Sequence, residues 1–408
     1  MSVARRARAL SRLLVVVTAL AAACSSGSDG TDGADGNPGA GDEAAGAATE
    51  AESFSGPVDA FYEVPDPLPP GEPGDLIRTM PVEAPPGESG LRIMYRSTDA
   101  EGDDRAVTGV LYHPTGEPPD GGWPIVAWAH GTSGLAAPCA PSRGPAPPPD
   151  FGVRGVRVAT DYIGLGPVGE LHPYLSAAAE GHAVIDGVAA ARSLPEAHAG
   201  DDWVVAGVSQ GGHAALVTNE MAADRLPGAD LLGAVALAPG SQLGEIYGDD
   251  LQARIITTMV LVGVASEDPG VDLGDYLSPD AHAAAAVIEE GCIGDIIEAM
   301  VPVAGSPDYF ATDPRTAAIG SAWLAENDPG QVASESPLLL VQGGQDVLVL
   351  PARTAALLDR LCGLGQVVDM LDVPDADHDT VTDRAGDDVA DWLAARFAGE
   401  PSPDDCPA

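Results

Sequence analysis

Lysine is absent from the sequence: all 19 basic residues are arginine, and they stand against 62 acidic residues. The formal net charge of -43 makes the surface so acidic that it repels phosphate backbones, which argues against nucleic acid as a partner. Aromatic residues are also scarce, at 4%, whereas hydrophobic residues make up 45%. A large core is therefore possible, and it must rest on Ala, Val and Leu. The 408 residues suffice for one large domain with insertions or for two ordinary domains.

A membrane-spanning run is also missing at the N-terminus, because the apolar stretch from Leu13 to Ala23 is short for a span. An arginine-rich start, this short apolar middle and small residues after it describe a secretory signal peptide over residues 1–23. Cys24 follows "LAAA", which resembles a bacterial lipobox, in which such a cysteine becomes the lipid-bearing first residue. We therefore expect a lipoprotein exported to the outer face of the bacterial cell membrane and anchored by Cys24. The alternative is plain secretion after cleavage near Cys24.

Cysteine is rare, with five residues in the chain. Without Cys24 four remain, an even number that permits two disulfides outside the cytosol. Four cysteines allow three connectivities, and their spacing does not choose among them. No two of them form a C-x-x-C pair, so they are poor candidates for a metal site. The four are Cys139, Cys292, Cys362 and Cys406.

Residues 24–56 consist mainly of Gly, Ala, Ser, Asp and Glu, so they predict a disordered tether with almost nothing to bury. Strand and helix patterns alternate farther along the chain. The expected strands are 91–98, 105–114, 123–131, 155–162, 203–209, 231–240, 337–346 and 366–375. The expected helices are 179–194, 211–226, 351–362 and 387–399. Such alternation predicts an α/β fold, with a mostly parallel sheet flanked by helices on both faces.

Helical patterns dominate residues 241–336 and interrupt this alternation. A segment of this length is too long for a loop, so we expect an inserted helical subdomain. The chain then divides into a first core part, 57–240, the insertion, a second core part, 337–398, and a C-terminal tail, 399–408.

Three glycines surround one serine where a strand pattern gives way to a helix pattern. Gly207, Ser209 and Gly211 match G-x-S-x-G, the sequence of a nucleophile elbow, in which a serine occupies a strained strand-to-helix turn. Side chains at the flanking positions would collide with the neighbouring strand and helix, so glycine is required there. The turn exposes the hydroxyl, and the backbone N–H of Gln210 can donate to an oxyanion. The alternative is a strand-to-helix turn that carries no chemistry.

A serine nucleophile needs a base, and in this arrangement the acid and then the histidine follow it along the chain. Only three histidines come after Ser209. His213 lies one turn into the following helix and would point elsewhere, and His282 lies in the helical insertion. His378 follows the last predicted strand, where the loops at the carboxyl edge of the sheet gather, so we predict that it is the base.

The acid should end a strand between the serine and the base. Asp346 leaves the sheet through two glycines before the next helix. Asp375, Asp377 and Asp379 crowd His378 in the sequence, but they indicate a solvated acidic loop. An orienting carboxylate has to approach the far nitrogen of the imidazole from another strand end, so Asp346 is the predicted acid.

The second oxyanion donor is expected in the loop after an earlier strand. "AWAHGTSG" fits this place, because Gly131 lets the backbone approach a substrate, and Gly131 or Thr132 can supply an N–H. His130 could be read as a metal ligand, but a packed, hydrogen-bonded histidine is the better interpretation.

Several motifs together resemble the secretory lipase family, a group of α/β hydrolases related to fungal lipase A that carry a helical cap between the later strands. The motifs are "HGTSG" with "CAPS" soon after, "ATDYIGLG" followed by "HPYL", and "GVSQGGHAA". The resemblance spans about Asp75 to Phe397. The chain departs from the family pattern at Arg154 and Arg157, which occupy a usually apolar strand, and in the Pro-rich stretch 145–149.

The resemblance implies an α/β-hydrolase fold with nucleophile Ser209, acid Asp346 and base His378, in agreement with the assignment from the residues. It also implies that the insertion 241–336 is a cap over an acyl-binding tunnel. Disulfides Cys139–Cys292 and Cys362–Cys406 follow from the same resemblance, as does a structural role for Asp161 and Tyr162 near the substrate entrance.

These observations lead to the hypothesis of a serine hydrolase that cleaves carboxylic esters, with a lipid, acylglycerol or small ester as substrate, through an acyl-enzyme. No metal or organic cofactor is needed. One alternative is an acyltransferase or a peptidase on the same fold. Another is a non-catalytic surface lipoprotein.

Overall fold

The structure, a computed structural model, describes residues 51–407 except residues 145, 247, 249, 269 and 315–317, and it leaves out the side chains of residues 318–321. The predicted signal peptide 1–23, Cys24 and most of the predicted tether 24–56 lie outside the described residues. The described residues belong to one compact unit that begins at Gly46. No helix among them is both long and apolar enough to cross a membrane.

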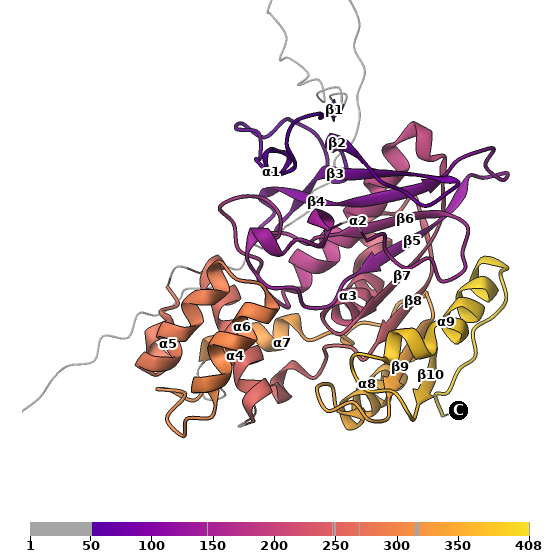
Figure 1. Cartoon of the computed structure of the whole chain (residues 1–408). Helices are drawn as coiled ribbons and strands as arrows, with labels where there is room; N and C mark the ends of the chain where they lie inside the picture. Colours follow the sequence, from indigo (N-terminus) through magenta and orange to yellow (C-terminus); the bar gives the residue numbers. More distant parts are fainter. Residues whose placement is uncertain are drawn as a thin grey trace, which may run out of the picture. The chain divides into compact units, whose positions relative to one another are not determined.

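Among these residues, ten strands form one sheet in the order β1-β2-β3-β4-β6-β5-β7-β8-β9-β10 (Figure 1). Every neighbouring pair from β6 to β10 is parallel, whereas β2, β3, β4 and β6 pair in antiparallel fashion. The sheet is therefore mostly parallel, as predicted. The strands are β1 (Glu52–Ser53), β2 (Leu76–Val82), β3 (Glu88–Thr98), β4 (Asp104–Pro114), β5 (Trp123–Ala129), β6 (Val156–Thr160), β7 (Ala199–Val208), β8 (Asp230–Leu237), β9 (Leu338–Gly343) and β10 (Val368–Val373).

Helices lie on both faces of this sheet and in the region between β8 and β9. Ser176 and Asp250 begin the second and fourth helices as N-caps, because their side chains accept backbone N–H groups of the first turn. The helices are α1 (Val58–Phe61), α2 (Ala177–Ser193), α3 (Gln210–Arg225), α4 (Leu251–Glu267), α5 (Pro279–Ala285), α6 (Ile293–Ala304), α7 (Ala318–Asn327), α8 (Pro351–Leu364) and α9 (Val381–Phe397).

The central strand β7 shows how the two faces are covered. Trp203 and Val205 pack in one hydrophobic cluster with α2, α3 and α8, whereas Val204 and Ala206 pack in another with α9. Successive side chains of a strand point to opposite faces, so an uninterrupted apolar run indicates a strand that is buried on both sides. The apolar run "WVVA" therefore fixes β7 at the centre of the fold.

Helices α4 to α7 lie within residues 241–336, between β8 and β9, and form a helical cap (Figure 1). They bury a hydrophobic cluster of their own, which includes Met259, Ile296 and Met300. Tyr174 and Leu175, from the segment before α2, belong to the same cluster. The cap therefore packs on loops of the core rather than standing apart from it.

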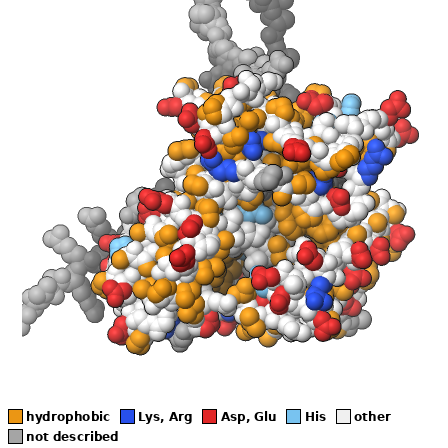
Figure 2. Space-filling view, viewed as in Figure 1, with side chains coloured by type: hydrophobic (Ala, Val, Ile, Leu, Met, Phe, Trp, Pro, Cys, Tyr) orange, Lys and Arg blue, Asp and Glu red, His pale blue; other side chains and the backbone are white. Residues whose placement is uncertain are grey.

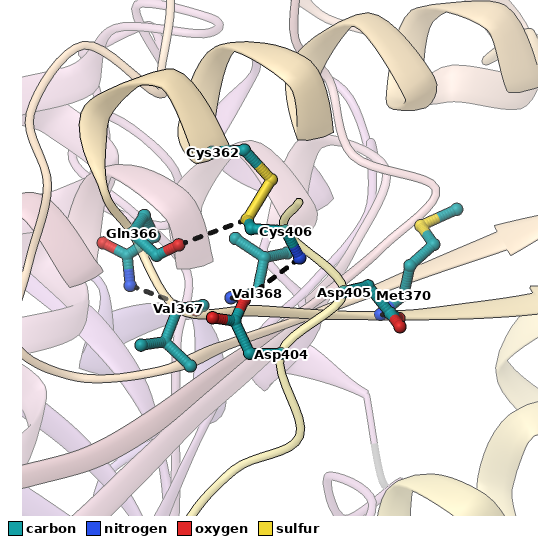
Figure 3. The surroundings of a disulfide bond; sticks show 8 residues. All are labelled: Cys362, Gln366, Val367, Val368, Met370, Asp404, Asp405 and Cys406. Carbon is teal, nitrogen blue, oxygen red and sulfur yellow. Dashed lines mark hydrogen bonds between the residues drawn. A yellow bond between two sulfur atoms is a disulfide. The ribbon is translucent and has the colours of Figure 1, made fainter. Parts of the chain in front are cut away.

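The described part of the chain contains two disulfides, in the pairs that the family resemblance implies. Cys139–Cys292 joins the loop after β5 to the start of α6. Cys362–Cys406 joins α8 to the C-terminal tail, as Figure 3 shows. Beside it, the backbone N–H of Asp405 donates to the carbonyl of Val368 at 2.8 Å. The tail therefore runs along β10 and covers part of the edge strand, a position that would otherwise leave backbone groups unpaired.

The N-terminal part of the core differs from the sequence prediction. Glu52–Ser53 forms β1 and pairs with β2, and Phe54 packs against the main hydrophobic cluster. These residues fall inside the range 24–56, so the tether prediction is wrong at its C-terminal end. Strand β2 itself was not predicted, because its polar residues and a proline hide the strand pattern.

Of the two arginines that depart from the family pattern, Arg157 is buried in β6, whereas Arg154 lies before the strand begins. The guanidinium of Arg157 pairs with Glu88 and donates to the carbonyl of Pro148 at 2.6 Å. Both partners compensate the cost of burying the charge. The strand therefore forms despite a cation in its middle.

Candidate active site

Ser209 lies on the sharp turn between β7 and α3, with φ 59° and ψ -115°. This left-handed backbone is strained for a residue with a side chain and is held by backbone hydrogen bonds on both sides. The N–H of Ser209 donates to Leu237 at 2.9 Å, and the N–H of Gly240 donates to the carbonyl of Ser209 at 2.9 Å. The end of β8 therefore fixes the turn.

The glycines around Ser209 make this turn possible because neighbouring backbone approaches closely. A Cβ on Gly207 would overlap the carbonyl of Gly211, and a Cβ on Gly211 would overlap the carbonyl of Ala129 in β5. A Cβ on Gly212 would lie 2.7 Å from the Cα of Pro239. The spacing of the motif is thus a packing requirement of the strand, the helix and the neighbouring strand.

Asp346 and His378 lie in the loops that follow β9 and β10, and their side chains meet. The Nδ1 atom of His378 is 2.8 Å from the Oδ2 atom of Asp346. The other oxygen, Oδ1, accepts the backbone N–H groups of Leu348 at 2.8 Å and Val349 at 2.9 Å. Because a carboxylate only accepts, Nδ1 carries the hydrogen, and Nε2 of the neutral ring is free to accept a proton.

Two glycines before Asp346 bring these loops together. The N–H of Gly344 donates to the carbonyl of Val373 at 2.9 Å, and a Cβ on Gly344 would lie 2.8 Å from the carbonyl oxygen of Pro374. By contrast, Asp375, Asp377 and Asp379 are exposed. The acidic residues next to His378 in the sequence are therefore solvated, and the distant Asp346 is the one that contacts the ring.

Ser209 and His378 line one cavity of about 850 Å³. Gly131, Thr132 and Gln210, the predicted oxyanion residues, line the same cavity. Among the described residues, no hydrogen bond joins Ser209 to His378. Catalytic hydrogen bonds are often long without a substrate and tighten only in the complex, so the geometry is compatible with proton transfer between them.

The loop after β5 is held in place by buried polar contacts. His130 donates from Nδ1 to the carbonyl of Gly131 at 2.6 Å, and Tyr162 donates to the carbonyl of His130 at 2.9 Å. Burial lowers the pKa of His130, so its ring stays neutral. The hydroxyl of Thr132 lies 2.8 Å from that of Tyr174. His130 is thus a packed histidine, and Tyr162 supports the same loop.

The remaining wall of the cavity is largely apolar. On the face shown in Figure 2, hydrophobic side chains gather over the cap helices, whereas acidic side chains are spread over the surface. The loop before α8 adds Val347, Leu348 and Leu350, all of them exposed. The apolar residues that the cap contributes to the lining include Ile246, Leu251, Ile255, Ile256, Ile293, Ile297 and Val301.

Sequence reasoning missed a group of buried polar residues next to the Ser209 turn. Glu180 is fully buried in α2 and contacts Gln210 and His213, and His172 also contacts Gln210. The sequence signal was weak: one acidic residue within an alanine-rich helix, and a histidine in "HPYL". His213 contacts Glu180 and the carbonyl of Asn327 and does not line the cavity, as expected from its place in α3.

The strand-to-helix serine turn and the acid–histidine pair at the carboxyl edge of a mostly parallel sheet define an α/β hydrolase. The family model described as "Secretory lipase" matches residues 153–405, which is more than half of the chain. The chain therefore belongs to the secretory lipase family, and the resemblance noted in the sequence is confirmed.

Solved structures agree with this fold. The chain is similar to Candida antarctica lipase A in its closed state, with 15% identity, a TM-score of 0.68 and coverage of 85% of this chain and 88% of that chain. It is also similar to a ligand-bound form of the rice cell wall degrading esterase LipA from Xanthomonas oryzae. The values there are 20% identity, a TM-score of 0.62 and coverage of 76% and 89%. A search of curated proteins gave no match.

Proposed function

We propose that the protein is a serine hydrolase that cleaves carboxylic esters. Ser209 is the nucleophile, His378 the base and Asp346 the acid that orients it. The observation that supports this most is the hydrogen bond between Asp346 and His378 beside the cavity that Ser209 lines. Membership of the secretory lipase family supports ester hydrolysis independently of that geometry.

The reaction begins when Nε2 of His378 takes the hydroxyl proton of Ser209 while Oγ attacks the acyl carbon. The backbone N–H of Gln210 and that of Gly131 or Thr132 donate to the oxygen that becomes negative. The imidazolium then gives its proton to the leaving alcohol as the ester C–O bond breaks, which leaves an acyl-enzyme. A water molecule, deprotonated by His378, attacks the acyl carbon and releases the acid, and the proton returns to Ser209.

The lining of the cavity favours an ester with an apolar acyl group, such as a lipid or acylglycerol ester. Isoleucine side chains from α4 and α6 line the same cavity as Ser209, and its volume of about 850 Å³ is that of a pocket for a sizeable small molecule. Each methylene group that leaves water contributes about 0.8 kcal/mol to binding. We therefore expect kcat/KM to rise with acyl chain length until the cavity is filled.

We also propose export of the protein, with Cys24 as the site of a lipid anchor at the cell surface. The two disulfides support an oxidising compartment, in which such bonds persist. Metabolic labelling with a palmitate analogue tests the anchor, since Cys24→Ser is expected to abolish labelling and to release the protein into the medium.

The nucleophile is tested with Ser209→Ala. The variant is expected to lose hydrolysis of p-nitrophenyl esters and labelling by a fluorophosphonate probe, while its thermal unfolding midpoint stays near that of the wild type. Ser55→Ala, which changes an exposed serine, is the matched control and should keep both properties. Unchanged turnover in Ser209→Ala would remove the assignment. Esters of graded chain length then measure the acyl preference.

A further inference from the structure

A buried carboxylate lies beneath the nucleophile turn and takes no part in the mechanism above. Glu180, in the first turn of α2, is 0% exposed. Its Oε1 atom accepts from Nε2 of Gln210 at 2.9 Å and from the backbone N–H of Leu175 at 3.2 Å. Its Oε2 atom accepts from Nδ1 of His213 at 2.6 Å. A charge buried so deeply requires a partner of opposite charge.

His213 supplies that charge. Its Nδ1 atom faces Glu180, and its Nε2 atom lies 2.8 Å from the backbone carbonyl of Asn327 at the end of α7. Carboxylate and carbonyl oxygens only accept, so both ring nitrogens carry hydrogen and the ring is an imidazolium. Burial alone would lower the pKa of His213, but the Glu180 carboxylate raises it above its ordinary value. Burial likewise opposes ionisation of Glu180, but the positive charge of His213 brings its pKa below the ordinary value.

The amide of Gln210 is locked against this carboxylate. One N–H donates to Oε1 of Glu180 and the other to Nε2 of His172, at 2.7 Å. His172 can accept there because its Nδ1 atom donates to the carbonyl of Ile163 at 2.8 Å. The amide oxygen of Gln210 has no partner among the described residues. The reverse orientation would press that oxygen against the carboxylate, so the charge of Glu180 selects the observed one.

Gln210 directly follows Ser209, and its backbone N–H is the proposed oxyanion donor. We propose that Glu180 is a positioning residue for ester hydrolysis: as a carboxylate it holds the side chain of Gln210 and thereby aims that backbone N–H at the oxyanion. The inference rests on the proposed serine hydrolase function. Oxyanion stabilisation depends on donors placed close to the position of the developing charge, so a loosened turn lowers kcat more than it changes substrate binding.

The test compares Glu180→Gln with Asp186→Asn. Asp186 is a second buried carboxylate of α2, bound to Ser97 and Arg225 and not to the nucleophile turn. With p-nitrophenyl esters we expect Glu180→Gln to lower kcat by about tenfold or more and to leave KM within about threefold. Asp186→Asn should keep kcat within about twofold of the wild type, even if its thermal unfolding midpoint falls by as much as that of Glu180→Gln. Equal losses of kcat at equal losses of stability would overturn the inference.

A double-mutant cycle shows whether Glu180 acts through Gln210. Gln210→Ala keeps the backbone N–H but removes its anchor, so its kcat should fall by a similar factor. In that background Glu180→Gln should change kcat by less than about twofold, because the contact is already gone. A further tenfold loss would place the action of Glu180 elsewhere and overturn the inference. If Glu180→Gln does not fold, Gln210→Ala alone decides. A wild-type kcat in Gln210→Ala overturns the inference, and the expected loss of kcat supports it.

Failure of this inference differs from failure of the proposed function. Hydrolysis by the wild type that Ser209→Ala abolishes establishes the nucleophile without reference to Glu180. A wild-type kcat in Glu180→Gln would then refute only the positioning role.

Discussion

Asp346→Asn tests whether a negative oxygen on Nδ1 of His378 sets the chemistry of the site. The Oδ1 atom of Asp346 accepts the backbone N–H groups of Leu348 and Val349. Asparagine has one accepting oxygen, which should stay on these two donors and turn the NH2 group toward the ring. Because NH2 donates, Nδ1 must accept, and the ring hydrogen moves to Nε2. The nitrogen that should receive the Ser209 proton is then already protonated.

Such a change of tautomer in a serine triad lowers kcat by about 10⁴. At about 1.4 kcal/mol per factor of ten, this corresponds to about 5 kcal/mol of lost transition-state stabilisation. The fold should survive, because the side chain keeps its size and both backbone hydrogen bonds on its buried side. KM should change little, since Asp346 does not line the cavity. Initial rates with a p-nitrophenyl ester between about pH 5 and pH 9, with thermal unfolding of each variant, measure both effects.

Asp377→Asn is the matched control, because Asp377 is next to His378 in the sequence but is exposed and bound to Thr380. It should retain at least about half of the wild-type kcat, as is typical of surface changes. The reasoning is refuted if Asp346→Asn keeps more than about a hundredth of the wild-type kcat, or if the control loses as much.

Three further predictions concern stability. Gly211→Ala forces a methyl group into the backbone of β5 and should lower the free energy of unfolding, measured with urea, by about 3 kcal/mol or more. The control Gly386→Ala places its Cβ in open space and should not destabilise the protein. Equal stability of the two variants would contradict the packing argument. Cys406→Ser opens a loop with a sequence separation of 44, so the free energy of unfolding should fall by about 4 kcal/mol; an unchanged urea midpoint would show that the tail contributes nothing. Because the pKa of His213 is raised, its contribution to the free energy of unfolding is present at low pH and is lost as pH rises through that pKa. Because the pKa of Glu180 is lowered, its contribution to the free energy of unfolding is present above about pH 4.5 and is lost as pH falls toward 2. The stability advantage of the wild type over Glu180→Gln should therefore shrink at both ends of the pH range, and a constant difference would contradict the ion pair.

Much of the fold could be predicted because the strands of its centre are short apolar runs bounded by glycine or proline. "WVVA" is buried on both faces, and in a chain of alternating strands and helices such a run predicts a central strand of a parallel sheet. At the sheet edge this signal is lost. Strand β2, "LIRTMPV", carries Arg78, which is buried. Its guanidinium donates to backbone carbonyls at the end of α1 and to that of Glu63, a compensation that no local sequence pattern shows.

The candidate site was predictable for a different reason. A strand-to-helix turn with a serine has local packing rules, and the chain order of acid and histidine removes most alternatives for the remaining positions. Asp346 was preferred to Asp377 because the carboxylate has to approach the imidazole from another strand end. The structure shows the hydrogen bond between Asp346 and His378, and the catalytic role of Asp346 stays a prediction. Glu180 was hidden because burial inside an alanine-rich helix is decided by partners 30 or more residues away, such as Gln210 and His213.

The cap is tied to the core at the start of α6 and at the end of α7, and this limits how a substrate can enter. At the start of α6, the Cys292 disulfide and the hydrogen bond from the N–H of Ile293 to the carbonyl of Ser133, at 2.9 Å, hold the cap to the loop after β5. At the end of α7, the imidazolium of His213 holds the carbonyl of Asn327. A rigid swing of the whole cap would break a covalent bond or strip a buried cation of its partner, and both are costly. An acyl chain is therefore expected to enter through the cavity already open beside Ser209, with local movement of the exposed side chains along its rim.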